Sequence, residues 1–65
     1  LKELDRKKII DFMKGKAEVF VDDIKERSGA EPLRVDAILF EEVRDGYVMV
    51  VKHGAWGEAE IVTLV

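Results

Sequence analysis

The alternation of apolar and charged positions predicts a first amphipathic helix over residues 2–14. Charged side chains fill one face of this segment, and apolar side chains recur on the other face at helical spacing. The apolar face consists of Leu4, Ile9, Ile10, Phe12 and Met13. Gly15 follows the last periodic position, where a glycine commonly ends a helix.

A short apolar run followed by charged residues predicts a strand and, directly after it, a second helix. Residues 19–21 are too few for a helix and are β-forming, so we expect them to form a brief strand. Asp22 or Asp23 can cap the next helix, and Asp23 with Glu26 has the spacing of a capping box. The Ser-Gly pair at residues 28–29 is expected to end this helix after little more than one turn.

A third helix is predicted to begin at Pro32 and to end before Gly46. Proline is tolerated at the first helical position, because its missing N–H would have no helical partner there. The apolar stripe of this helix consists of Val35, Ile38, Leu39 and Val43. The short break at Gly29 and Ala30 is typical of the glycine-containing turn of a helix-turn-helix.

The end of the chain predicts a two-stranded β-ribbon. Residues 47–52 and 59–65 are rich in β-formers, and residues 53–58 form the hairpin loop between them. This order of elements is that of a winged helix-turn-helix domain, so we predict one α+β domain over residues 1–65, with the ribbon as its wing. Residues 19–21 should pair with the ribbon. The expected core contains Ile9, Phe12, Met13, Ile24, Val35, Ile38, Leu39 and Val43.

Composition narrows the class of protein. The 65 residues are 48% apolar and include no cysteine, so neither disulfides nor thiolate metal sites can stabilise the fold. No apolar run approaches the roughly 20 residues of a membrane helix, and we expect a cytoplasmic protein without membrane contact. Asparagine and glutamine are also absent, while lysine and glutamate are plentiful, which is typical of thermophile proteins.

The uneven distribution of charge argues against DNA recognition by the third helix. Of the net charge of −3, six basic and three acidic residues give +3 in residues 1–16, whereas four basic and nine acidic residues give −5 in residues 17–46. DNA affinity depends largely on neutralising phosphates. We expect the exposed positions of the third helix to include Glu31, Arg34, Asp36 and Glu41. Of these, only Arg34 is suited to a bidentate contact with guanine.

The basic residues near the start of the chain allow two interpretations. Lys2, Arg6, Lys7 and Lys8 can form a solvated helix face that pairs with neighbouring carboxylates, or a patch that faces phosphates or an acidic partner. The expected carboxylate partners are Glu3, Asp5 and Asp11. If DNA is bound, weakly, the candidate residues are Lys2, Arg6, Lys7, Lys8, Arg34 and Lys52.

No combination of residues predicts catalysis, and we expect neither an enzyme nor a cofactor or metal site. His53, Ser28 and Thr63 are the single residues of their types, and the serine and threonine are better explained as a turn and a strand residue. One histidine without cysteine cannot form a zinc site. Glu41 and Glu42 are successive on a helix and should point to different sides.

Trp56 also allows two interpretations. The ring can cover the edge of the ribbon, or it can stand exposed at the tip of the wing as an anchor for a partner. His53 is either a plain loop residue or a source of pH-dependent charge beside it. The candidate partner-binding residues are Glu41, Glu42, Lys52, His53 and Trp56.

Three stretches of the chain resemble the dissimilatory sulfite reductase D family. The resemblance runs from Lys7 to about Val51. It rests on residues 8–13 (Lys-Ile-Ile-Asp-Phe-Met), residues 19–24 (Val-Phe-Val-Asp-Asp-Ile), and Val35 with Ile38, Leu39 and Val43. It implies a winged-helix protein without catalytic residues that activates a dissimilatory sulfite reductase. The basic third helix of that family is not reproduced here.

Together these observations favour a non-catalytic regulatory module that binds a protein partner, which the resemblance names as dissimilatory sulfite reductase. A DNA-binding transcriptional regulator of the winged-helix type is the alternative, because that fold commonly binds nucleic acid.

Overall fold

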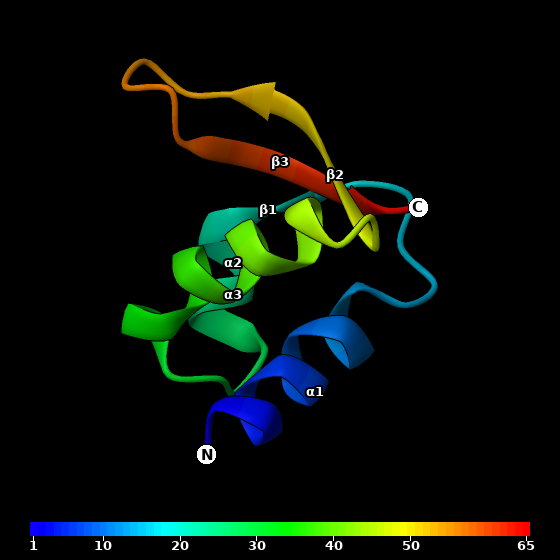
Figure 1. The fold of residues 1–65 in the computed structure, drawn as a ribbon, viewed down its shortest axis with the longest axis vertical. Coiled ribbons are helices and arrows are strands. Elements are labelled where there is room, and N and C mark those ends of the chain that lie inside the picture. Colours follow the sequence, from blue (N-terminus) through cyan, green and yellow to red (C-terminus); the bar gives the residue numbers. More distant parts are fainter.

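Three helices and a three-stranded antiparallel sheet form the fold in the computed structural model, which describes residues 1–65. The elements are α1 (Lys2–Met13), β1 (Val19–Phe20), α2 (Val21–Arg27), α3 (Pro32–Arg44), β2 (Val48–His53) and β3 (Ala59–Leu64). Figure 1 shows the sheet on one side of α2 and α3 and α1 on the other side. The predicted α+β class is confirmed, and the arrangement is consistent with a winged-helix-like fold.

The sheet has the strand order β1-β3-β2, which places the last strand of the chain in its centre. Val19 pairs with Val62 and Phe20 with Ile61, so the predicted pairing of the short strand with the ribbon is confirmed. Between β2 and β3 the register shifts at Val51, which leaves this residue without an opposite partner. Such a bulge bends and twists an edge strand.

The ends of α1 and α3 lie where the sequence predicts them. Gly15 and Gly46 follow these helices with φ angles of 79° and 87°, a region that glycine enters without steric cost. At the other end of α3, Pro32 is the first helical residue, and the Glu31 side chain accepts a hydrogen bond from the Leu33 N–H at 3.4 Å.

The predicted start of α2 is wrong. Val21 is the first residue of this helix rather than the last residue of a strand, and no side chain caps it. The capping box of Asp23 and Glu26 is therefore absent. The physical reason is that Val21 is buried in the core, so packing begins the helix before the first aspartate. The resulting α2 is seven residues long.

The core lies between the helices and the inner face of the sheet. Its buried apolar residues are Ile9, Met13, Val19, Val21, Ile24, Ala30, Val35, Ile38, Leu39, Val48 and Val62. Six of the eight predicted core residues are among them. Phe12 is only partly buried, and Val43 is 37% exposed. Leu4, expected on the apolar face of the first helix, is exposed as well.

The last buried residue of α3 is Glu42 and not, as predicted, Val43. Val35, Ile38, Leu39 and Glu42 are the buried residues of this helix. They follow the spacing of three and four that defines one helix face. Val43 is thereby turned toward the hairpin. None of the helices combines the length and apolarity that crossing a membrane requires.

Replacing Leu39 with Ala should reduce the free energy of unfolding by about 2–5 kcal/mol, because it removes a buried side chain and leaves a cavity. Chemical denaturation followed by circular dichroism measures the loss. Leu33→Ala is the matched control, since Leu33 lies on the same helix and is 91% exposed; its effect should stay within about 0.5 kcal/mol. Equal effects of the two substitutions would contradict the core described above.

Candidate functional site

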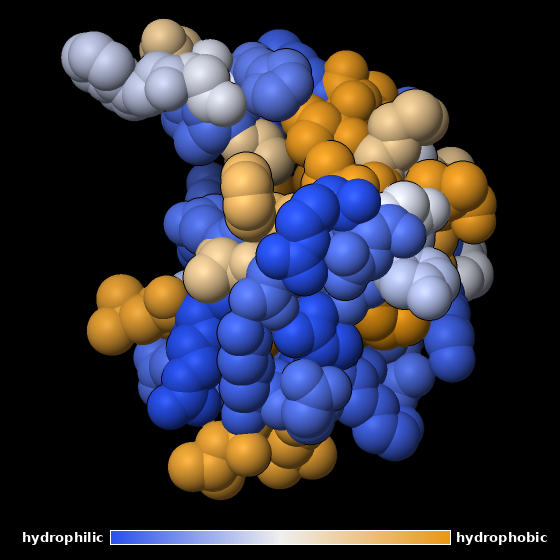
Figure 2. Space-filling model, in the orientation of Figure 1, coloured by the Kyte–Doolittle hydropathy of each residue, from blue (hydrophilic) through white to orange (hydrophobic).

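The largest hollow on the molecule is a groove between α3 and the hairpin of β2 and β3. Its volume is about 510 Å³. Figure 2 shows the hairpin tip projecting beyond the body of the molecule, with the surface hollowed beneath it. The groove is lined by Asp36, Leu39, Phe40, Val43, Val50, His53, Gly57, Glu58 and Ala59. Most of these side chains are apolar, and the polar ones are histidine and carboxylates.

The exposed side of α3 next to this groove is apolar. Leu33, Ala37 and Phe40 follow one another at spacings of four and three residues, which places them on one side of the helix. Leu33 is 91% exposed and Phe40 is 71% exposed. In DNA-binding helix-turn-helix proteins the corresponding helix enters the major groove. Here the exposed side of α3 carries apolar side chains, which neither neutralise phosphates nor form hydrogen bonds with base edges.

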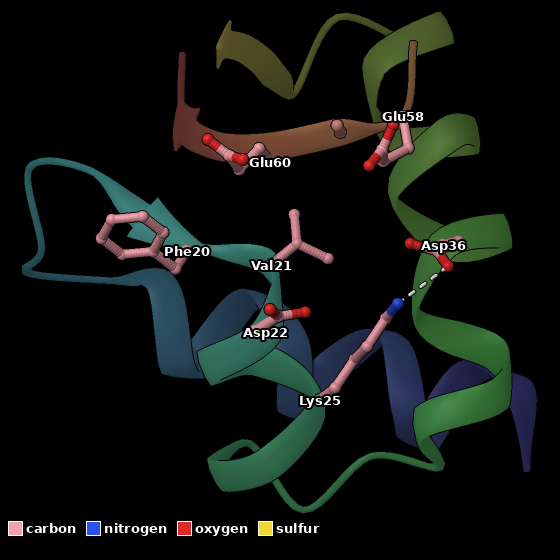
Figure 3. Close-up of a pocket in the computed structure, with 8 residues that line it drawn as sticks. Phe20, Val21, Asp22, Lys25, Asp36, Glu58 and Glu60 are labelled. Carbon is pink, nitrogen blue, oxygen red and sulfur yellow. Dashed lines mark hydrogen bonds and ion pairs between the residues drawn. The ribbon is translucent and has the colours of Figure 1, made fainter. Parts of the chain in front are cut away.

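A second, smaller hollow of about 190 Å³ adjoins the groove between α2, α3 and β3. Figure 3 shows Asp22, Asp36, Glu58 and Glu60 around it, with Lys25 pointing toward Asp36. The Lys25 Nζ lies 3.0 Å from Asp36 Oδ2 and is the one basic group in its lining. Asp36, Glu58 and Ala59 line both hollows, so the groove has an acidic border on this side. The carboxylates do not gather into a group that could hold a metal ion.

The hairpin loop is closed by its own polar groups. The Gly54 N–H donates to the Glu58 carbonyl at 2.8 Å, and the Trp56 N–H donates to Glu58 Oε1 at 2.9 Å. His53 Nδ1 lies 3.0 Å from the Gly57 carbonyl oxygen. A Cβ atom on Gly54 would collide with the Glu58 carboxylate, so a larger residue there would displace this flexible side chain from the loop.

Trp56 stands at the tip of this closed loop with 92% of its surface exposed. The interpretation of the ring as a cover over the ribbon is therefore wrong, and the exposed alternative holds. The Glu58 side chain and the backbone close the loop without a contact from the indole.

The carboxylates of Glu41 and Glu42 are bound within the molecule rather than offered to a partner. Arg6 of α1 donates from Nη2 to Glu41 Oε1 at 2.6 Å and from Nη1 to Glu42 Oε1, and Lys2 Nζ lies 2.6 Å from Glu41 Oε2. The expectation that the two carboxylates point to different sides fails, because one planar guanidinium reaches both. Glu42 is 6% exposed, which removes it from any partner-facing surface.

This ion-pair cluster shifts the protonation of its members. Hydrogen bonds from Arg6 and then from Lys2 lower the pKa of Glu41 from 4.5 to about 2. In return, the hydrogen bonds to Glu41 and Glu42 raise the pKa of Arg6 above its usual range.

Arg34, the candidate for reading guanine, is held by α1. Its Nη1 lies 2.9 Å from Oδ2 of Asp5, and the other carboxylate oxygen of Asp5 accepts from the Glu31 N–H at 3.3 Å. The hydrogen bond from Arg34 is the main cause that lowers the pKa of Asp5. Asp5 thus ties α1 to the start of α3 and engages the guanidinium that base recognition would need.

The remaining basic candidates also contact acceptors of the same chain. Lys7 Nζ lies 2.7 Å from Asp11 Oδ2, Lys8 Nζ lies 3.4 Å from the Gly29 carbonyl oxygen, and Lys52 Nζ lies 3.0 Å from Glu60 Oε2. The interpretation as a face paired with neighbouring carboxylates therefore holds only in part, because Asp5 pairs with Arg34 instead and most other partners lie on other elements. The expected pairs within the first helix are those of Arg6 with Glu3 and of Lys7 with Asp11.

Comparisons with protein-family models, with curated proteins and with solved structures find no match to this chain. A function for this chain is therefore inferred from the groove and the hairpin. The structure brings His53 to the groove and Trp56 to the loop beside it, while Glu41 and Glu42 face α1. Sequence reasoning missed Phe40 and Asp36. The signal for Phe40 was the second apolar stripe of the third helix, formed by Leu33, Ala37 and Phe40, whereas Asp36 was expected to be exposed but not to line a groove.

Acid should weaken the attachment of α1 to α3. A carboxylate with a lowered pKa stabilises the fold above its unfolded value and loses this contribution as pH falls through its folded value. For Glu41 the window runs from 4.5 down to about 2. The free energy of unfolding should fall as pH is lowered through this window, measured by denaturation at a series of pH values.

The variant Glu41→Gln keeps the size of the side chain and removes its titration. Its stability should depend less steeply on pH between 4.5 and about 2 than that of the unaltered chain. Glu26→Gln is the matched control, because Glu26 is exposed and has no ion-pair partner. Identical pH profiles for all three proteins would show that the Arg6–Glu41 pair contributes nothing.

Proposed function

We propose that this chain is a non-catalytic winged-helix module that docks onto a protein partner through α3 and the hairpin. The observation that carries the proposal is the exposed apolar side of α3, with Leu33 91% and Phe40 71% exposed beside a mostly apolar groove. Exposed apolar surface of this kind marks interaction sites, because leaving it in water is unfavourable.

The winged helix-turn-helix assignment is supported by the order of elements and by the sheet. The short turn between α2 and α3 contains Gly29 at a φ of 87°, and β2 and β3 form the hairpin in the position of a wing. The same fold can serve different functions, so docking is inferred from the exposed side chains of α3 and the hairpin.

Trp56 supports docking for an independent reason. Tryptophan is enriched among the residues that dominate binding energy at interfaces. The bond from the Trp56 N–H to Glu58 holds the loop backbone that carries the ring, so less backbone entropy is lost when a partner covers it. Its exposed surface is then a cost in the free chain that binding removes.

The charge of the same face counts against DNA binding as the function. Asp36 and Glu58 border the groove, and Arg34 is engaged by Asp5. Phosphates would be repelled rather than neutralised at this surface. The exposed Lys7 and Lys52 lie on α1 and β2, and Lys25, which is next to α3, is paired with Asp36.

The resemblance to the dissimilatory sulfite reductase D family names the first partner to test, with this chain as an activator. We expect a complex with a dissimilatory sulfite reductase that Trp56→Ala weakens by about 2 kcal/mol, or about 30-fold in the dissociation constant. Calorimetry measures the affinity, and sulfite turnover measures activation.

Leu4→Ala is the matched control for this test, because Leu4 is an exposed apolar residue of α1 outside the proposed face. It should leave the affinity unchanged, and both variants should stay folded by circular dichroism. The absence of a complex together with unchanged turnover would exclude this partner. Full affinity of the Trp56→Ala variant would exclude the tryptophan as an anchor.

Duplex DNA should bind only weakly, with a dissociation constant no tighter than about 10⁻⁵ M at physiological salt. Fluorescence anisotropy of a labelled duplex measures this affinity and its salt dependence. Any binding should involve the Lys2–Lys8 end or Lys52, so Lys52→Ala should reduce it while Arg34→Ala should not. Nanomolar, sequence-selective binding that is lost on Arg34→Ala, in a variant that remains folded, would instead support the DNA-binding alternative.

A further inference from the structure

The groove between α3 and the hairpin is lined by an apolar floor and by polar side chains at its border. Leu39, Val50 and Ala59 form apolar parts of the lining, and Phe40 and Val43 continue the apolar surface along α3. Residues 36–43 of α3 extend over about 10 Å at the usual helical rise. The groove has a volume of about 510 Å³, which lies within the range of roughly 300–1,000 Å³ that ligand sites occupy.

The polar side chains of the groove are hydrogen-bond acceptors. Asp36 and Glu58 are carboxylates; Lys25 contacts one oxygen of Asp36 and the Trp56 N–H one oxygen of Glu58, which leaves the second oxygen of each to accept from a ligand. His53 Nδ1 lies 3.0 Å from a carbonyl oxygen, which can only accept, so this nitrogen carries the proton. In the neutral ring the other nitrogen, Nε2, is then an acceptor as well. A ligand that satisfies these groups has to bring donors.

The hollow beside the groove adds further carboxylates to those of the groove. Asp22 and Glu60 line the adjoining hollow; Lys25 pairs with Asp36 and Lys52 with Glu60, so the four carboxylates of the two hollows outnumber the lysines paired with them by two. Ligands that carry phosphate or carboxylate groups would be repelled from this border. A ligand with Lys or Arg next to apolar groups would place its positive charges near the carboxylates of the border and bury its apolar groups against the apolar floor of the groove.

We propose that the groove binds a basic amphipathic segment of a protein partner, with one or two bulky apolar side chains on the floor and Lys or Arg side chains against Asp36 and Glu58. This inference rests on the proposed docking function and names the chemistry of the partner. The length of the groove accommodates about two turns of a helix. Helices that lay an apolar face into a groove are a common mode of peptide recognition.

The test is a titration of the ¹⁵N-labelled chain of 65 residues with synthetic 12-residue peptides, followed by amide chemical shifts. One peptide contains Leu and Lys in helical spacing, a second has Glu in place of Lys, and a third has Ala in place of Leu. Only the Leu/Lys peptide should shift the amides of Phe40, Val43, Val50 and Ala59. Its dissociation constant should be at least about tenfold lower than those of the other two.

Substitutions in the chain assign the binding to the groove. Phe40→Ala should weaken the Leu/Lys peptide about tenfold, whereas Leu4→Ala, which removes an exposed apolar side chain of α1 outside the groove lining, should change the affinity less than twofold. Glu58→Gln removes one charge and keeps an acceptor for the Trp56 N–H. It should weaken binding more than Glu26→Gln, which removes the same charge elsewhere.

Several results would overturn the inference. Equal binding of the Lys and Glu peptides would show that charge does not select the ligand, and an unchanged affinity of Phe40→Ala would place the binding elsewhere. Groove shifts that appear on raising the protein concentration alone would show that a second copy is the occupant. Groove shifts caused by a DNA duplex would show a nucleic acid there instead.

The outcome also separates this inference from the proposed function. If a partner complex is weakened by Trp56→Ala and unaffected by Phe40→Ala, docking stands and the groove inference fails. If the Leu/Lys peptide shifts the groove while the sulfite reductase forms no complex, the groove inference stands and that partner is excluded.

Discussion

The pairing of Arg6 with two successive carboxylates is the interaction on which the arrangement of the helices depends. α1 lies on the side of α3 that faces away from the sheet, so it is held by its own contacts with the other helices. Ile9 and Met13 supply the apolar part of this contact. Arg6 supplies the polar part and makes it possible for Glu42 to be buried, since a buried carboxylate without a partner would be strongly unfavourable.

The same pairing decides which chemistry is left at the surface. The basic residues of α1 and the acidic residues at the end of α3 neutralise each other across the helix contact. What remains accessible on α3 is the opposite side, with Leu33, Phe40 and Asp36. An arrangement of elements that commonly serves DNA binding thereby presents an apolar and acidic face, which is why the proposed function is protein docking.

The hairpin completes this face without exposing a regular sheet edge. β2 is an outer strand, and an unpaired outer strand can pair with other chains. The bulge at Val51 interrupts its regular hydrogen bonding, and Lys52 adds a charge next to it. In the proposed docking, we therefore expect a partner to contact the side chains of the groove and Trp56 rather than the strand edge.

The sequence by itself determined the elements of this protein, because their signals are local. Gly15, Pro32 and Gly46 set the ends of helices through their own backbone preferences, and the spacing of Val35, Ile38 and Leu39 predicted the buried side of α3. The brief strand and the ribbon followed in the same way from short runs of β-formers.

Only the tertiary structure decided which side chains meet. Arg6 and Glu41 are 35 positions apart, and no local pattern states that the guanidinium will bridge two neighbouring carboxylates. That contact buries Glu42 where the apolar pattern predicts Val43, and it leaves Val43 to line the groove. The groove, the exposed Trp56 and the engagement of Arg34 likewise depend on how α1, α3 and the hairpin pack. Packing depends on the whole chain, because the residues that a helix buries are those for which neighbouring elements supply apolar contacts or hydrogen-bond partners.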